Sequence, residues 1–418
     1  MTGNAEPAAP LTILHTDFHR GWGGQINRVL VECRGLLARG HRVVLAIPGG
    51  GRPVARAREW GIPLFEDVRF RPVSRVRSLF ADAYALQRLL DALRPDIVHS
   101  HGSQDTWAVA LANRLLPRPK APALLGGGRG ARRALPGHAV HVLTRHNTKK
   151  VRDSLANRWL FRRAVDGLIV VARDTLECYE PLVRRGLIDP RKVSVLPSPL
   201  RPDLLEGTAP DGRRVRDEIG AGPGDFVAGT LARLVPDKGQ RHLLEAMAAL
   251  QRELPASRLV LAGDGESEPA LREQARAAGI ADRVHFLGFR EDVAEILAAL
   301  DVAVLPSVGC DASSGMLKEA LALGVPVVAT EIGDARAILG DGAFGLVVPP
   351  GDAPALAAAI ASVARDLPAA RSRAAAGGRH VRETYTVERL VDGLEQTYRD
   401  LLATVGMSRR ILGADGHL

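Results

Sequence analysis

The sequence has little cysteine. Three cysteines, Cys33, Cys178 and Cys310, are spread over 418 residues, and none of them lies in a Cys-x-x-Cys pair. Three thiols cannot all pair, and their spacing is not that of a zinc ribbon, so we expect neither a disulfide scaffold nor a structural zinc site. This cysteine usage predicts a reducing compartment.

The sequence also lacks long hydrophobic runs. No stretch approaches the roughly 18–20 apolar residues of a membrane-spanning helix, because the most apolar stretches are interrupted by Asp301 or Arg365. The first residues, Met1 to Pro10, are polar and rich in proline and alanine, without the basic and apolar regions of a signal peptide. We therefore expect a cytoplasmic protein, with at most peripheral contact at the inner face of the cell membrane.

The composition fits two globular domains. Hydrophobic residues make up 46% and charged residues 25% of the chain, which excludes global disorder. The charges are unevenly distributed, since residues 1–200 contain 32 Lys and Arg against 16 Asp and Glu, whereas residues 201–418 contain 24 against 31. A basic first half predicts an anionic partner, such as a phosphorylated lipid, an acidic glycan, a membrane surface or a nucleic acid.

Both halves of the chain alternate short β-rich runs with helical patterns, which favours parallel βαβ units. The proline-rich segment Leu196–Pro202 between the halves is typical of an inter-domain linker. The pattern predicts two doubly wound α/β domains in tandem, with ligands at the carboxyl ends of the strands and in the cleft between the domains. The expected strands are Leu11–Thr16, Arg42–Ile47, Asp96–His99, Val140–Thr144, Leu168–Val171, Val193–Leu196, Val227–Leu231, Leu259–Ala262, Val284–Leu287, Val302–Leu305, Val327–Ala329 and Leu346–Val348.

One stretch, Pro117–His138, interrupts this alternation with prolines, three consecutive glycines and arginines. We expect a mobile loop there. Its Gly-x-Gly-x-x-Ala spacing follows only a weak strand and opens no clear helix, which disfavours a dinucleotide-binding loop.

The segment from Val304 to Thr330 carries the strongest functional signal. A strand ends at Pro306, a small polar loop follows, and either Ser313 or Ser314 is placed to cap a helix. The backbone N–H groups of Gly315, Met316 and Leu317 would then lie at the positive end of that helix, which suits a phosphate group. Glu319, about one turn further on, could accept two hydrogen bonds from a vicinal diol such as ribose.

These residues resemble a known signature. Asp311 and Glu319, separated by seven residues and followed by Ala-Leu-Ala-Leu-Gly-Val-Pro-Val-Val-Ala-Thr, are similar to the two-acid motif of the retaining GT-B glycosyltransferases of family 4. The resemblance spans roughly Leu11 to Thr397. It is supported by Gly23-Gly24, Pro95–His101, Thr144–His146, Leu231–Gly239, Leu261–Gly265 and Val284–Phe289.

The resemblance implies a GT-B fold, in which two Rossmann-like domains face each other across a cleft. Residues 1–200 would form the acceptor-side domain, residues 201–385 the nucleotide-sugar-binding domain, and a last helix at 386–404 would pack back onto the first domain.

The resemblance also assigns roles to donor-side residues. Arg233 and Lys238 should hold the donor diphosphate and stabilise the charge that grows on the leaving group, while Glu319 should bind the donor ribose. Asp311 should contact hydroxyl groups of the transferred sugar, although the family usually has the longer Glu there. The remaining residues expected to bind the donor are Gly24, Gly263, Gly265, Phe289, Ser314, Gly315, Met316 and Leu317.

Two histidines lie at the end of the expected strand Asp96–His99. His99 and His101 are two residues apart and share a face of the strand, but a metal site would need a third ligand that no motif supplies, so no metal is predicted. By resemblance, His101 orients the donor sugar or the acceptor, whereas His99 is expected to be a packed strand histidine. The expected acceptor-side residues are Trp22, Gln25, Arg145 and His146.

The sequence therefore predicts a retaining glycosyltransferase without metal or cofactor, which moves a sugar from a nucleotide-sugar to an acceptor. The acceptor is expected to be an anionic cell-envelope glycan or glycolipid, such as lipopolysaccharide. Three alternatives stay open at this point: an epimerase or hydrolase that consumes the donor without an acceptor, a nucleotide-sugar-binding or scaffold protein without catalysis, and nucleic-acid binding through the basic half. The last has no recognised motif to support it.

Overall fold

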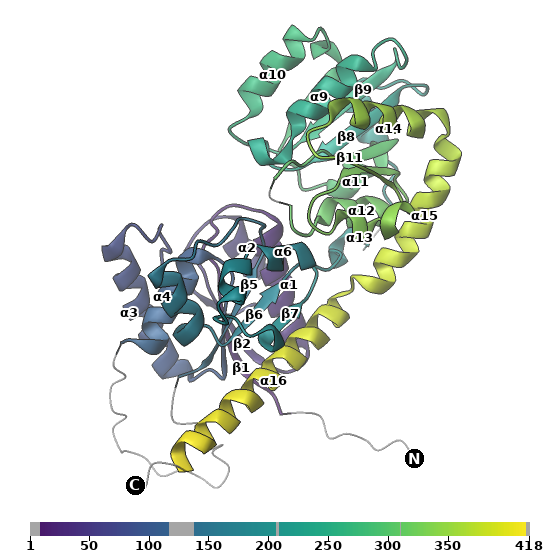
Figure 1. The fold of residues 1–418 in the computed structure, drawn as a ribbon. Coiled ribbons are helices and arrows are strands. Elements are labelled where there is room, and N and C mark those ends of the chain that lie inside the picture. Colours follow the sequence, from purple (N-terminus) through teal and green to yellow (C-terminus); the bar gives the residue numbers. More distant parts are fainter. Residues whose placement is uncertain (1–8, 117–137, 206–208, 310, 415–418) are drawn as a thin grey trace, which may run out of the picture.

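Two parallel β-sheets organise the molecule into two domains (Figure 1). The computed structural model describes residues 9–116, 138–205, 209–309 and 311–414, with side chains omitted at 205 and 406–414. The predicted doubly wound α/β architecture is confirmed. The expected loop at Pro117–His138 lies, apart from His138, outside the described residues, as does Cys310.

The first sheet has seven strands in the order β3-β2-β1-β4-β5-β6-β7, all parallel. Its strands are β1 (Thr12–Thr16), β2 (Arg42–Ala46), β3 (Leu64–Phe65), β4 (Ile97–Ser100), β5 (Val140–Arg145), β6 (Gly167–Val170) and β7 (Val193–Val195). Its helices are α1 (Gly24–Ala38), α2 (Arg52–Glu59), α3 (Val76–Leu93), α4 (Ser103–Arg114), α5 (Leu155–Trp159), α6 (Arg173–Glu177) and α7 (Glu180–Arg184).

The second sheet has six parallel strands in the order β10-β9-β8-β11-β12-β13. Its strands are β8 (Phe226–Leu231), β9 (Ser257–Ala262), β10 (Val284–Gly288), β11 (Val302–Leu305), β12 (Val327–Thr330) and β13 (Leu346–Val348). Its helices are α8 (Arg213–Glu218), α9 (Gln240–Ala249), α10 (Glu268–Ala277), α11 (Val293–Ala299), α12 (Gly315–Ala322), α13 (Ala335–Ile338) and α14 (Ala353–Arg365).

Each sheet reverses its strand order once, between β1 and β4 in the first and between β8 and β11 in the second. Ligands of such sheets bind outside the carboxyl ends of the strands at this reversal, where the adjacent loops diverge. The predicted site residues Gly24 and His101 follow β1 and β4, and Arg233, Lys238 and Asp311 follow β8 and β11. The topology therefore places both groups where a ligand is expected.

Two long helices connect the second domain back to the first. The helices α15 (Leu367–Thr384) and α16 (Val387–Ala414) run along one side of both domains (Figure 1). Leu394 and Tyr398 of α16 are buried in the same hydrophobic core as Ile13 and Leu30 of the first domain. The last helix thus packs onto the first domain and runs on to Ala414, beyond the expected end at residue 404.

The helix α15 packs closely against α12, the helix with the strongest functional signal. A Cβ atom added at Gly378 would lie 2.6 Å from the carbonyl oxygen of Leu321, and one added at Gly377 would lie 2.7 Å from Cβ of Phe344. The two consecutive glycines therefore allow α15 to approach α12 closely and do not form a turn.

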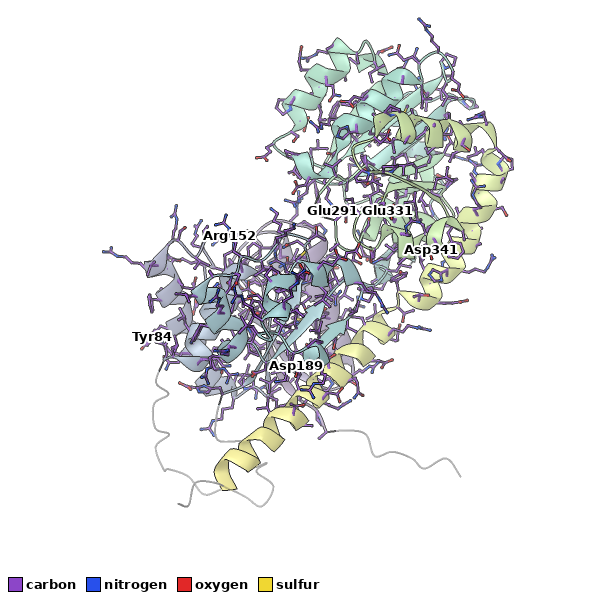
Figure 2. All side chains as sticks on the ribbon, in the orientation of Figure 1. Tyr84, Arg152, Asp189, Glu291, Glu331 and Asp341 are labelled. Carbon is purple, nitrogen blue, oxygen red and sulfur yellow. The ribbon has the colours of Figure 1, made fainter. Side chains whose placement is uncertain are left out.

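Each of the expected strands overlaps an observed one, and only β3 was not expected. It consists of two residues at the sheet edge, too few for a periodic pattern. The thiols of Cys33 and Cys178 are buried. None of the described helices is long and apolar enough to cross a membrane. Figure 2 shows Tyr84 on the side of the first domain that faces away from the second, and Glu291 on the side of the second domain that faces the first.

Candidate active site

The helix α12 begins at the end of the loop that follows β11. Ser314 caps it, since its hydroxyl oxygen accepts a hydrogen bond from the N–H of Leu317 (3.4 Å). The predicted N-cap is therefore confirmed, and the first turn carries the positive end of the helix dipole. Asp334 holds the loop in place by accepting bonds from the hydroxyl of Ser313 (2.7 Å) and the N–H of Ser314 (3.3 Å), and burial raises the pKa of its carboxyl to about 6.

Lys238 and Asp311 meet although they are distant in sequence. The ammonium of Lys238 lies 2.7 Å from Oδ2 of Asp311, and the hydroxyl of Ser307 donates to the same oxygen (3.0 Å). Lys238 ends a single 3-10 turn after β8, and Gly239 follows it in the left-handed conformation with φ of 66°. The residues predicted for diphosphate and sugar binding thus form an ion pair beside the first turn of α12.

Arg233 and Glu319, the other two residues expected to bind the donor here, differ in their exposure to solvent. Arg233 is exposed, and within the described residues its guanidinium makes no ion pair. Glu319 is 8% exposed, and burial raises the pKa of its carboxyl, an effect that Arg201 opposes from 3.9 Å. A Cβ atom at Gly315 would lie 3.6 Å from Oε1 of Glu319, so this carboxylate lies close to the first residue of the helix.

The glycines predicted for the nucleotide pocket allow two loops to approach closely. A Cβ atom at Gly263 would lie 2.0 Å from the carbonyl oxygen of Ala232, and one at Gly265 would lie 2.2 Å from that of Leu234. Phe289 contacts the opposite domain, because the guanidinium carbon of Arg52 at the start of α2 lies 3.7 Å from the centre of its ring. One face of the Phe289 ring is therefore covered by a planar cation from the first domain.

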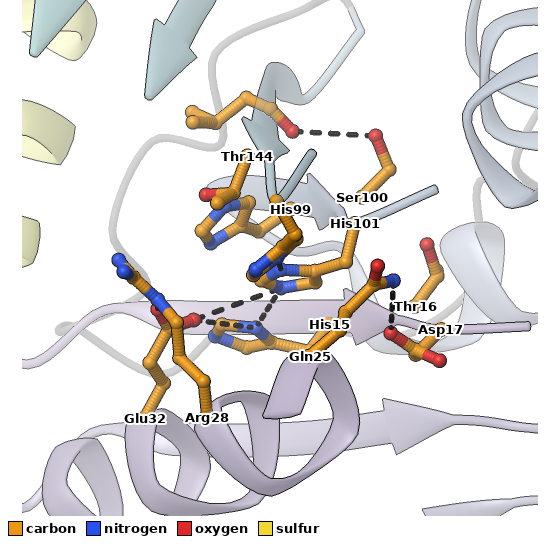
Figure 3. Close-up of polar contacts among 12 residues, drawn as sticks. His15, Thr16, Asp17, Gln25, Arg28, Glu32, His99, Ser100, His101 and Thr144 are labelled. Atoms are coloured by element: carbon orange, nitrogen blue, oxygen red, sulfur yellow. Dashed lines mark hydrogen bonds and ion pairs between the residues drawn. The ribbon is translucent and has the colours of Figure 1, made fainter. Parts of the chain in front are cut away.

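The glycine turn of the first domain leads directly into α1. Gly24 is the first residue of the helix, and the side chain of Gln25 donates to Oδ2 of Asp17 (2.7 Å) (Figure 3). Trp22 lies below the guanidinium of Arg56 at 5.9 Å. Gln25 is therefore held by a buried carboxylate that the sequence analysis did not single out.

His101 and His146 are in contact, since Nδ1 of the first lies 3.0 Å from Nε2 of the second. Arg145 points elsewhere and donates to the carbonyl oxygen of Lys149 (2.8 Å). His99 is the packed strand histidine that was expected, because its two ring nitrogens contact the hydroxyls of Tyr398 (2.7 Å) and Thr144 (2.6 Å). Burial lowers the pKa of His101 and of His99 well below the usual value, so both rings are neutral at pH 7.

Further buried polar side chains near the site were not predicted. Lys318 of α12 donates to the carbonyl oxygen of Ser198 in the linker and to the hydroxyl of Ser313, both at 2.7 Å, and burial lowers its pKa to about 8. The others, His15, Arg28 and Glu32, lie side by side below His101 (Figure 3). Two signals in the sequence could have found these residues. Arg28 and Glu32 are four residues apart on the apolar face of a helix, which indicates a buried ion pair. A lysine between the apolar residues Leu317 and Ala320 likewise indicates a buried cation.

Two family models match successive parts of the chain. The model for glycosyltransferase family 4 matches residues 22–204, and the model for glycosyl transferases group 1 matches residues 225–366. Together they cover every predicted site residue and all strands of the two sheets except β1.

Similar proteins include enzymes with different acceptors in their names. The 2-deoxystreptamine N-acetyl-D-glucosaminyltransferase of Streptomyces fradiae is 29% identical over 396 residues, which cover 88% of this chain and 90% of that one. The lipopolysaccharide core biosynthesis glycosyltransferase LpsE of Rhizobium meliloti is 34% identical over 42% of this chain and 49% of its own length. The crystal structure of Anabaena HepE in complex with UDP-glucose has a TM-score of 0.75 at 20% identity and covers 93% of this chain and 100% of that one, which shows that the two share a fold.

Replacing Gly239 by alanine is expected to destabilise the second domain by more than about 3 kcal/mol, since backbone strain adds to a clash. A Cβ atom there would lie 1.9 Å from the carbonyl oxygen of Pro306. Gly279→Ala is the matched control, because Gly279 has φ of 67° but no atom within 4 Å of the added Cβ; it should cost only about 1–2 kcal/mol. Urea unfolding measures both, and equal losses would contradict the packing of these two loops.

Proposed function

The chain belongs to glycosyltransferase family 4 and is a nucleotide-sugar glycosyltransferase, and we propose that it transfers the sugar, with retention of anomeric configuration, to an anionic glycan or glycolipid of the cell envelope. The observation that carries this proposal is the Lys238–Asp311 pair at the N-terminus of α12. It combines a cation for the leaving diphosphate with a carboxylate for the sugar at one point of the fold.

The donor diphosphate would bind between the helix N-terminus and the two cations. The N–H groups of Gly315 and Met316 are available to phosphate oxygens, whereas that of Leu317, which was also expected to bind phosphate, donates to the hydroxyl of Ser314. Arg233 is exposed and makes no ion pair within the described residues, and Lys238 can exchange Asp311 for a phosphate. Because these groups supply positive charge where negative charge develops, they stabilise the departing nucleoside diphosphate. We propose on this ground that transfer needs no metal at the diphosphate.

Retention is supported by the roles proposed for the two carboxylates of the donor site, which leave neither of them to act as base or nucleophile. An inverting reaction needs a protein base opposite the leaving group, and a double displacement needs a carboxylate nucleophile at the anomeric carbon. Glu319 is assigned to the ribose and Asp311 to sugar hydroxyls, so neither is free for these roles. The acceptor hydroxyl would instead attack on the face from which the diphosphate departs, form the new glycosidic bond, and pass its proton to an oxygen of that leaving group.

The shorter Asp311 is compensated by its surroundings. Its carboxylate is fixed from two sides by Lys238 and by the hydroxyl of Ser307. When Lys238 turns to the diphosphate, Oδ2 of Asp311 keeps the bond from Ser307 and gains one acceptor position for a hydroxyl of the sugar. Binding of the donor would therefore replace the ion pair between Lys238 and Asp311.

The proposal that the acceptor is anionic rests on the distribution of charge along the chain. Residues 1–200 contain 32 Lys and Arg against 16 Asp and Glu, whereas residues 201–418 contain more acidic than basic residues. His101, His146, Gln25 and Trp22 lie at the carboxyl edge of the first sheet. The relatives act on acceptors as different as 2-deoxystreptamine and the lipopolysaccharide core, by their names. The basic balance of this chain favours an anionic acceptor, and lipopolysaccharide is one candidate.

Arg233→Ala or Lys238→Ala removes one of the two cations proposed to hold the diphosphate. Each variant should lower kcat/KM by a factor of roughly 30 to 1,000, which corresponds to a loss of about 2–4 kcal/mol of transition-state stabilisation. Steady-state transfer assays with the preferred donor measure this loss. Arg241→Ala, which removes an exposed cation of the neighbouring helix α9, should retain the wild-type rate. Wild-type rates in both site variants would remove the proposed leaving-group role.

Asp311→Asn should retain more transfer than Asp311→Ala, because the amide keeps the size and one carbonyl acceptor for the sugar. The anomeric configuration of the product, determined by NMR, should equal that of the donor. An inverted linkage, or a covalent sugar–enzyme adduct trapped by Asp311→Asn, would contradict the proposed mechanism.

Affinity for the acceptor should weaken as salt rises from about 0.1 to 0.5 M, since the screening length falls below about 10 Å. Affinity for the donor should change less, because Lys238, Asp311 and Glu319 of its proposed site are largely buried and therefore less screened. Titrations of both ligands over this range test the charge argument, and acceptor binding that is independent of salt would contradict an anionic acceptor.

A further inference from the structure

The helix α3 carries an exposed apolar stripe on the outside of the first domain (Figure 1). Val76, Phe80 and Tyr84 follow one another at intervals of four residues and therefore lie on one face of the helix. Their exposures are 56%, 52% and 61%, and the other exposed large hydrophobic side chains of the described residues are scattered over other elements. Single exposed apolar side chains are ordinary, whereas three in one stripe, two of them aromatic, indicate a contact surface.

The opposite face of α3 already has its packing partner. Leu86 and Leu90 lie in the same hydrophobic core as Val109 of α4. The start of the helix is fixed by Asp82, whose buried carboxylate oxygens accept hydrogen bonds at 2.7 and 2.9 Å from two backbone N–H groups of the preceding loop. The stripe is therefore a second apolar surface on a helix that is already held in place.

Arginines surround this stripe. From Arg69 to Arg88 the sequence has five arginines and one acidic residue, the buried Asp82. All five arginines are exposed, and none of their side chains forms an ion pair or a hydrogen bond within the described residues. They are Arg69, Arg71, Arg75, Arg77 and Arg88. Guanidinium groups without a partner, next to exposed aromatic rings, are available to an anionic ligand.

A depression of about 980 Å³ lies at the start of α3, beside the first residue of the stripe. The groups of its lining that could bind an anion belong to Arg69, Arg75, Arg77 and Ser78. The hydroxyl oxygen of Ser78 is buried and has no hydrogen-bond partner in the described part of the chain. Of the acidic residues in the lining, Glu66 pairs with Arg58 and Asp82 accepts the backbone bonds, which leaves Asp67 against three guanidinium groups. A phosphate group in this depression would therefore meet several donors.

The size of the surface favours a membrane over a protein partner. A stable protein interface takes about 20–30 residues from each side, whereas the stripe has three apolar side chains on one convex helix. A helix with aromatic side chains between arginines suits the interface of a bilayer, where the rings enter the headgroup region and the guanidinium groups meet phosphates. The excess of arginine matches anionic headgroups in particular.

We propose that α3 and the loop before it dock the protein onto a membrane that contains anionic phospholipids. Phe80 and Tyr84 would enter the headgroup region, and a lipid phosphate would bind in the depression at the start of the helix. Tyr84 lies on the side of the first domain that faces away from the second (Figure 2). Docking through this side would therefore leave the second domain off the membrane.

This inference deepens the proposed function, because it would bring a glycolipid acceptor close to the cleft. The loop before α3 follows β3 and leaves the carboxyl edge of the first sheet, the edge that also carries Gln25 and His101. In that sheet β3 and β1 are two strand spacings apart, which is about 10 Å. An acceptor anchored in the bilayer would need to reach across only this short distance.

The test measures binding of the full chain to large unilamellar vesicles in co-sedimentation titrations, without donor or acceptor. Vesicles of equal parts phosphatidylglycerol and phosphatidylcholine should bind the wild type at least about tenfold more tightly than vesicles of phosphatidylcholine alone, and added salt should weaken this binding. Tyr84→Trp should add fluorescence that brominated acyl chains quench, because position 84 enters the bilayer. Leu155→Trp, at a position of α5 that is 81% exposed, should not.

Two double variants separate the apolar from the charged contribution. Phe80→Ser with Tyr84→Ser should weaken binding to the anionic vesicles by about tenfold or more, because less apolar area is buried. Arg75→Gln with Arg77→Gln should weaken it about 30-fold, since each arginine near an anionic surface contributes roughly a factor of five. The matched controls are Leu155→Ser and, in the second domain, the exposed pair Arg252→Gln with Arg379→Gln. Both controls should bind like the wild type, and all variants should keep its melting temperature.

Wild-type protein that does not bind the anionic vesicles, or binds both kinds of vesicle equally, would overturn the proposal. So would folded α3 variants that bind like the wild type, controls that lose binding to the same extent, or a Trp at position 84 that brominated lipids do not quench. A dimer of the lipid-free protein that Phe80→Ser with Tyr84→Ser dissociates would assign the stripe to a second copy instead. Because these measurements need no sugar transfer, the docking surface and the proposed transfer to an anionic acceptor can fail separately.

Discussion

Two buried cations hold the linker between the domains from opposite sides. Arg28 of α1 donates to the carbonyl oxygen of Leu196 (2.6 Å), and Lys318 of α12 donates to that of Ser198 (2.7 Å). Buried charges are tolerated only when other groups compensate them, and here Glu32 pairs with Arg28 while Ser313 and Asp334 lie near Lys318. The helices α1 and α12 each begin at the carboxyl edge of their own sheet. The contacts of Arg28 and Lys318 with the linker therefore also fix how the carboxyl edges of the two sheets lie relative to each other.

The site depends on this constraint. The loops after β8 and β11 are locked together by glycines that allow backbone contact, which brings Lys238 to Asp311. The first domain closes over the nucleotide side through Arg52 on the ring of Phe289 and meets α12 through the hydrogen bond from the N–H of Ser198 to Ser313 (3.3 Å). A donor that displaces Arg52 and draws Lys238 from Asp311 would therefore change contacts in both domains at once.

The fold was predictable because strands buried on both faces appear as short apolar runs separated by helices. The loop and cap around Asp311 and Ser314 could be singled out because they lie in one continuous segment, Val304–Thr330, that ends a strand and opens a helix. Arg233 and Lys238 lie in another segment and were assigned by resemblance alone, and the donor roles of all these residues stay predictions. The buried network of His15, Glu32 and Lys318 was not predictable, since its members come from separate elements and only the folded sheet brings them together. Phe289 shows a similar limit, because its partner Arg52 belongs to the other domain and no local pattern joins them.

The central claim is that the diphosphate of the donor binds at the start of α12 between Arg233 and Lys238. The most direct test is a crystal structure of the full chain with a bound nucleoside diphosphate, after UDP, GDP and ADP have been compared for binding. The account predicts phosphate oxygens at the first turn of α12 and the ammonium of Lys238 within about 3 Å of one of them, the distance of a charge-assisted hydrogen bond, rather than on Asp311. A nucleotide bound elsewhere, or a diphosphate that leaves the Lys238–Asp311 pair intact, would contradict it.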